Sequence, residues 1–99
     1  MDKKELKQGI IESYIHSNKR IGVLLELRCQ TDFVAKTEEF KTLAHELCLQ
    51  IAAMNPRKSE FLRQPWIKDE SKKIGDLVRE YKEKLGEDIV IKRFIRYEF

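Results

Sequence analysis

Residues 20–29 carry a hydrophobic side chain at every second position, the repeat expected of a β-strand with one buried face. That face comprises Ile21, Val23, Leu25, Leu27 and Cys29. Residues 9–16, GIIESYIH, are also rich in β-branched and aromatic residues, and only three residues separate the two segments. The pattern predicts a β-hairpin. Apolar residues point to both faces of its first strand, as in a strand that is covered on both sides.

The hydrophobic period then changes from two to 3.6, which indicates helices. Thr37 is a suitable N-cap for a first helix, and Asn55-Pro56 would end it. Ser71 is expected to cap a second helix, and Gly86 to supply the left-handed residue after its last turn. Between the two helices, residues 56–70 look irregular, with one helical turn at 59–63.

Residues 88–99 alternate again and predict a third strand, interrupted only by Arg93. Its predicted core-facing residues are Ile89, Ile91, Ile95, Tyr97 and Phe99. The order strand, strand, helix, helix, strand predicts an α+β fold, in which two main helices pack on one face of a three-stranded antiparallel sheet.

Length and charge narrow the class of protein. Ninety-nine residues make one domain. The 20 basic and 17 acidic residues give a net charge of +3, which argues only weakly for a polyanion partner. No stretch suits a membrane span or a signal peptide, so no membrane partner is expected. The spacing of Cys29 and Cys48 suits no metal site, so we expect two buried thiols and no cofactor.

One string is more specific than these general features. Residues 29–36, CQTDFVAK, follow the strand sequence RIGVLLE at 20–26. Together they closely resemble the core domain of translation elongation factor Ts, the nucleotide exchange factor for the GTPase elongation factor Tu. Further agreements follow in the same order: YIH at 14–16, LQIAA at 49–53, QPWI at 64–67, SKKIG at 71–75 and RFIRYE at 93–98. The resemblance covers residues 9–99.

The resemblance implies a role in translation, as a guanine nucleotide exchange factor for elongation factor Tu. It implies that the chain itself makes and breaks no covalent bonds. Members of the family normally begin with a small helical domain and a linker. Here we expect residues 1–8 to be a remnant of that linker and 9–99 to be the core. The family also implies a homodimer through this core, in the bacterial cytoplasm or in an organelle.

The resemblance also implies which residues contact the partner. Thr31, Asp32, Phe33 and Val34 would lie at an exposed tip, with Asp32 and Phe33 pushed toward the Mg²⁺ and nucleotide site of elongation factor Tu. Gln50 would lie near a second contact. Without the family, Phe33 would be interpreted as a core aromatic and Gln50 as an exposed polar residue of an amphipathic helix.

The sequence offers two alternative functions. An enzyme would have to recruit Cys29, Asp32 and His45, which show no nucleophile signature. The basic and aromatic stretch 92–99 resembles an RNA-stacking strand and suggests, as the alternative, a small basic α+β RNA-binding module. Because Tyr97 and Phe99 share the predicted core face, they would be unable to stack on bases. We therefore expect no nucleic-acid partner.

Overall fold

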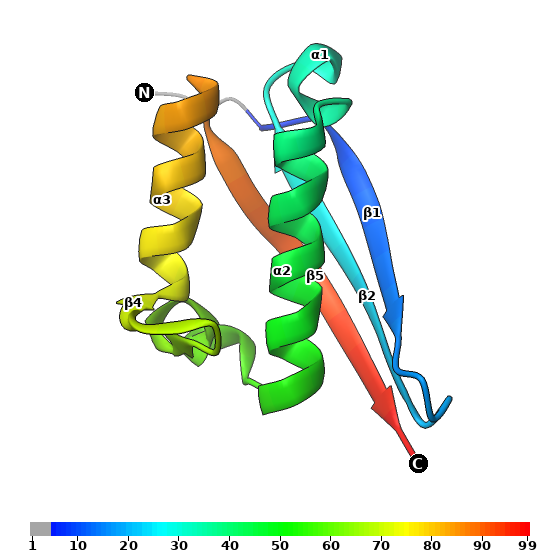
Figure 1. Cartoon of the computed structure of the whole chain (residues 1–99). Helices are drawn as coiled ribbons and strands as arrows, with labels where there is room; N and C mark the ends of the chain where they lie inside the picture. The colour runs from blue at the N-terminus through cyan, green and yellow to red at the C-terminus, as the bar shows by residue number, and fades with distance from the viewer. Residues whose placement is uncertain (1–4) are drawn as a thin grey trace.

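The computed structural model describes residues 5–99. Three strands, β1 (Gln8–Ile15), β2 (Ile21–Cys29) and β5 (Ile89–Glu98), form an antiparallel sheet in the order β1-β2-β5. Two long helices, α2 (Glu38–Met54) and α3 (Ile74–Leu85), cover one face of it (Figure 1). The predicted hairpin and fold class are confirmed.

The first long helix begins and ends where the sequence indicates. The Thr37 hydroxyl accepts a hydrogen bond from the Phe40 amide at 3.1 Å, and Asn55 adopts the left-handed conformation at the other end of α2. Gly86 does the same after α3, with φ 71°. These end signals are local, which explains why they could be predicted.

The N-cap predicted for the second helix is wrong. Ser71 lies in a short strand, β4 (Asp69–Lys73), and its hydroxyl donates to the Asp69 carboxylate at 2.6 Å. The N-cap lies two residues later, at Lys73, and the Asp76 carboxylate accepts from the Lys73 amide at 2.9 Å. Ser71 is thus part of β4, and the contact between Lys73 and Asp76 marks the start of α3 instead.

The connection between the helices contains more structure than predicted. A 3₁₀ helix, η1 (Lys58–Arg63), contains the predicted helical turn. A two-residue strand, β3 (Pro65–Trp66), then pairs with β4. Phe61 of η1 is fully buried and joins the core between the sheet and the helices. The segment is therefore anchored, even though its sequence has no clear period.

The last strand departs from strict alternation. Arg93 pairs with Glu26, whereas Ile91 pairs with the next residue of β2, Leu27, so Lys92 is an extra residue on β5. Such a β-bulge reverses the faces of all the residues that follow it. Phe94 consequently turns to the core and packs against Phe61, with ring centroids 5.2 Å apart.

The predicted burial of the end of β5 is therefore wrong. Ile89 is buried and Ile91 is partly buried, as expected. Beyond the bulge, Ile95 is 45% exposed, Tyr97 70% and Phe99 95%. Ile95 and Tyr97 point to the face of the sheet that the helices leave open.

Candidate functional site

The predicted partner-binding tip is a single helical turn, α1 (Asp32–Ala35), between β2 and α2. It lies at the end of the molecule where α3 also ends, away from the β1–β2 turn (Figure 1). Thr31 caps it, because the Thr31 hydroxyl accepts from the Val34 amide at 3.2 Å. The sequence predicted only a connecting turn here, since four residues are too few to show a helical period.

The turn has one buried side and one exposed side. Val34 and Ala35 are buried in the core. Phe33 is 81% exposed. A phenyl ring this exposed gains little from the hydrophobic effect in the chain alone. It is therefore available to contact another molecule.

Asp32 is also exposed on the tip. Its carboxylate forms an ion pair with the Lys36 ammonium at 2.9 Å, and both side chains are mostly exposed. The carboxylate raises the pKa of Lys36 through this hydrogen bond. Exposed pairs of this kind contribute little to folding and are screened by salt. Asp32 can therefore exchange Lys36 for a partner group at small cost.

The base of the tip is bonded to the loop between α3 and β5. The Glu87 carboxylate accepts from the Gln30 amide and the Thr31 amide, both at 3.1 Å, and from the Thr31 hydroxyl at 2.6 Å. Glu87 was not identified from the sequence. It is 56 residues from Thr31 and belongs to no motif, so no local signal could have pointed to it.

Gln50 lies in a buried environment and is hydrogen-bonded. It is 0% exposed, so the expectation of an exposed helix residue is wrong. Its amide nitrogen donates to the Pro65 carbonyl at 3.0 Å and its amide oxygen accepts from the Ile67 amide at 2.9 Å. The side chain thus joins α2 to the β3 segment. Its predicted role at a partner contact stays a prediction, and such a role would be exerted through residues 65–67.

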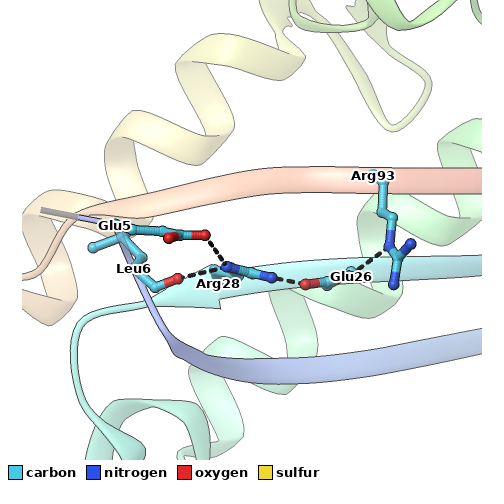
Figure 2. Close-up of polar contacts among 5 residues, drawn as sticks. All are labelled: Glu5, Leu6, Glu26, Arg28 and Arg93. Carbon is cyan, nitrogen blue, oxygen red and sulfur yellow. Dashed lines mark hydrogen bonds and ion pairs between the residues drawn. The ribbon is translucent and has the colours of Figure 1, made fainter. Parts of the chain in front are cut away.

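The open face of the sheet carries a chain of charges (Figure 2). Glu26 accepts from Arg28 and from Arg93, both at 2.6 Å, and Arg28 also reaches Glu5 at 3.2 Å and the Leu6 carbonyl at 2.9 Å. The hydrogen bond from Arg28, followed by the one from Arg93, lowers the pKa of Glu26. Two acids and two bases alternate, so their charges balance.

Apolar side chains surround these charges. The exposed ones that point to the open face are Ile11, Ile15, Leu24, Val90, Ile95 and Tyr97. Because Tyr97 and Phe99 are exposed, burial in the core does not prevent them from stacking on RNA bases. Of the nearby bases, however, Arg93 is paired with Glu26, and Arg96 donates to the Ala52 carbonyl at 2.9 Å. A largely aliphatic face with balanced charge is better suited to protein than to phosphate.

The residues that an enzyme would recruit, Cys29, Asp32 and His45, each bond to different groups. Cys29 is buried, burial raises its pKa, and its thiol donates to the Thr31 carbonyl at 3.2 Å. His45 lies 3.6 Å from the Glu12 carboxylate instead.

Within residues 5–99 no group of three His, Cys, Asp or Glu side chains is placed to hold a metal ion. In the same part of the chain, no helix is long and apolar enough to cross a membrane.

Comparison with known proteins identifies the family. The model of the elongation factor Ts family matches residues 1–58 and, in an overlapping match, residues 30–99. Elongation factor Ts of Moorella thermoacetica is 36% identical over 96% of this chain and 70% of its own length. Elongation factor Ts of Thermotoga neapolitana is 39% identical over 93% of this chain and 69% of its own length. That of Thermodesulfovibrio yellowstonii is 38% identical over 96% of this chain and 70% of its own length. The chain belongs to the elongation factor Ts family of translation elongation factors.

Proposed function

We propose that this chain binds the GTPase elongation factor Tu and accelerates the release of GDP from it. The observation that carries the proposal is the exposure of Phe33 on a turn whose other side is buried. An aromatic ring held outward on an anchored element is suited to insertion into a partner. Asp32, beside it, would place a negative charge at the same contact.

The proposed action requires no bond chemistry. Phe33 inserted between two elements of the GTPase would displace groups that hold the water shell of its Mg²⁺. Because the metal is the largest positive charge near the nucleotide phosphates, its loss weakens their binding. By linkage, a factor that prefers the nucleotide-free GTPase lowers the affinity for GDP by the same ratio.

A direct test measures release of a fluorescent GDP analogue from elongation factor Tu after excess GDP is added. The expected result is a release rate that rises with the concentration of the 99-residue chain and then saturates. A rate that stays at the intrinsic value, while the chain binds the GTPase in a pull-down, would contradict exchange but not binding. Absence of both would contradict the proposal altogether.

We also propose that the open face of the sheet binds a second copy of the chain. Monomeric proteins rarely expose large contiguous apolar patches, and this face exposes six apolar side chains around balanced charges. The pattern of β1 favours a strand covered on both faces, yet the helices cover only one. Pairing of two open faces would bury Ile11 and Ile15 as that pattern requires.

Sedimentation equilibrium over a range of concentrations tests the pairing. Ile95→Lys should shift the chain toward the monomer, because it places a charge in the proposed interface. Ile67→Lys, also an exposed isoleucine but outside the three-stranded sheet, is the matched control and should leave the mass unchanged. A wild-type chain that stays monomeric would contradict the pairing. Salt-sensitive binding of single-stranded RNA by that monomer would instead favour the RNA alternative.

A further inference from the structure

We infer that Glu87 is a positioning residue for the tip that carries Asp32 and Phe33. The inference rests on the proposed function, in which that tip contacts the GTPase. Glu87 itself lies in the loop after α3 and not on the tip. Its role would be to hold the tip in one orientation before the partner arrives.

The geometry shows why a carboxylate suits this position. Three donors converge on it: the Gln30 and Thr31 amides on one oxygen and the Thr31 hydroxyl on the other. Strand β2 ends at Cys29, so the amides of Gln30 and Thr31 lie beyond the hydrogen-bond ladder of the sheet. One ionised carboxylate accepts all three hydrogen bonds, and such charge-assisted bonds are stronger than neutral ones.

The contact also determines how Thr31 caps the tip. A hydroxyl has one proton and two lone pairs. The Thr31 hydroxyl donates its proton in a hydrogen bond to Glu87, so a lone pair of the hydroxyl oxygen is left to accept from the Val34 amide at 3.2 Å. Within residues 5–99 the hydrogen bonds of Glu87 go to Gln30 and Thr31, so Glu87 acts on α1 through Thr31.

The loop that carries Glu87 is itself held in place. The Asp88 amide donates to the Gln30 side-chain oxygen at 2.6 Å, so the two segments are bonded in both directions. Immediately afterwards, Ile89 begins β5 and pairs with Cys29 of β2. The Asp88 carboxylate also pairs with Lys82 of α3 at 3.2 Å. Glu87 thus transmits the rigidity of the sheet and of α3 to the tip.

A tip held in this way loses less conformational entropy when it binds the GTPase, so its affinity for the GTPase is higher. Displacement of an interacting group by about 1 Å can lower a rate by up to roughly 100-fold. For Glu87→Ala we expect loss of about 10-fold in the stimulated rate of GDP release, since Val34 and Ala35 still anchor the turn. Glu87→Gln keeps an acceptor for the backbone amides and should recover part of the loss.

The first measurement is amide hydrogen exchange in the isolated 99-residue chain. The Val34 amide is the informative probe, because it bonds to Thr31 and not to Glu87. It should exchange about 10-fold faster in Glu87→Ala, consistent with loss of a cap. The matched control is Glu83→Ala: Glu83 is exposed on α3, one turn earlier, and its side chain has no hydrogen bond or ion pair within residues 5–99. Unchanged exchange at Val34 in Glu87→Ala would overturn the inference.

The second measurement is a double-mutant cycle in the GDP-release assay, with Glu87→Ala, Phe33→Ala and both. If Glu87 acts through the tip, Glu87→Ala should cause a smaller fold-loss in the Phe33→Ala background than in the wild type, because only the contribution of Asp32 is left to lose. An undiminished fold-loss in the double variant would overturn the inference, because Glu87 would then act on the GTPase independently of the tip. If Phe33→Ala alone left GDP release unchanged, the proposed function would be wrong, while the Val34 amide would still decide whether Glu87 holds the tip.

Discussion

Phe33 and Val34 are consecutive residues of one helical turn that face opposite ways: the phenyl ring is 81% exposed and the valine side chain only 5%. The buried valine anchors the turn, and the exposed ring is left for contact with another molecule. The two side chains therefore have separable consequences for stability and for binding.

Phe33→Ala should leave the free energy of unfolding within about 0.5 kcal/mol of wild type, because no cavity forms in the core. It should nevertheless remove most of the stimulation of GDP release. The matched control, Val34→Ala, should cost about 1–3 kcal/mol of stability. Urea denaturation and the GDP-release assay measure the two effects. Strong destabilisation by Phe33→Ala, with normal release per folded molecule, would contradict the wedge.

Asp32→Asn should lower the stimulated release rate by less than Phe33→Ala does, because it removes the charge and keeps the shape. Its effect should shrink at high salt. Lys36→Met separates the carboxylate itself from the ion pair, since it breaks the pair and retains Asp32. We expect Lys36→Met to leave the rate unchanged or raise it. An equal loss in both variants would show that the ion pair, and not the Asp32 carboxylate alone, is required.

Gln50→Ala should destabilise the chain by about 1–3 kcal/mol, because it removes the hydrogen-bond partner of the part-buried Pro65 carbonyl and Ile67 amide. Thr42→Ala, on the exposed side of the same helix, should change stability far less. Urea denaturation measures both. A normal stability for Gln50→Ala, together with weaker binding to elongation factor Tu, would instead support a role for Gln50 at a partner contact, exerted through residues 65–67.

The bulge in β5 predicts a reversed order of sensitivity along the strand. Phe94→Ala should cost about 2–4 kcal/mol, since Phe94 packs against the buried Phe61, whereas Ile95→Ala should cost less than about 1 kcal/mol. The unfolding measurements belong at a concentration where sedimentation shows a monomer. A larger loss at Ile95 than at Phe94 would indicate continuous alternation without the bulge.

The buried cysteines should be unreactive in the folded chain. Burial, with a further contribution from Glu12, raises the pKa of Cys48 to about 12. At pH 8 its thiolate fraction is then roughly 1,000-fold below that of an ordinary thiol, and alkylation should slow accordingly. Iodoacetamide labelling with and without urea checks this. Rapid labelling of Cys48 in the native chain, or an oligomer lost on mild reduction, would contradict the assignment.

Local signals in the sequence were sufficient for much of the fold. The alternation in β2, the cap at Thr37 and the left-handed ends at Asn55 and Gly86 each depend on neighbouring residues only. The string at 29–36 indicated the family and the tip. A strand repeat and a helix cap are properties of a few consecutive residues, so the chain carries them wherever it folds.

Contacts between distant segments decided the rest. The extra residue Lys92 on β5 is defined only by pairing with β2, and it reversed the faces of Ile95 and Tyr97. Gln50 is buried because residues 65–67 fold over it, and Thr31 is held by Glu87, 56 residues away. Register and long-range hydrogen bonds depend on which segments meet in space, and a single sequence without that pairing does not specify them.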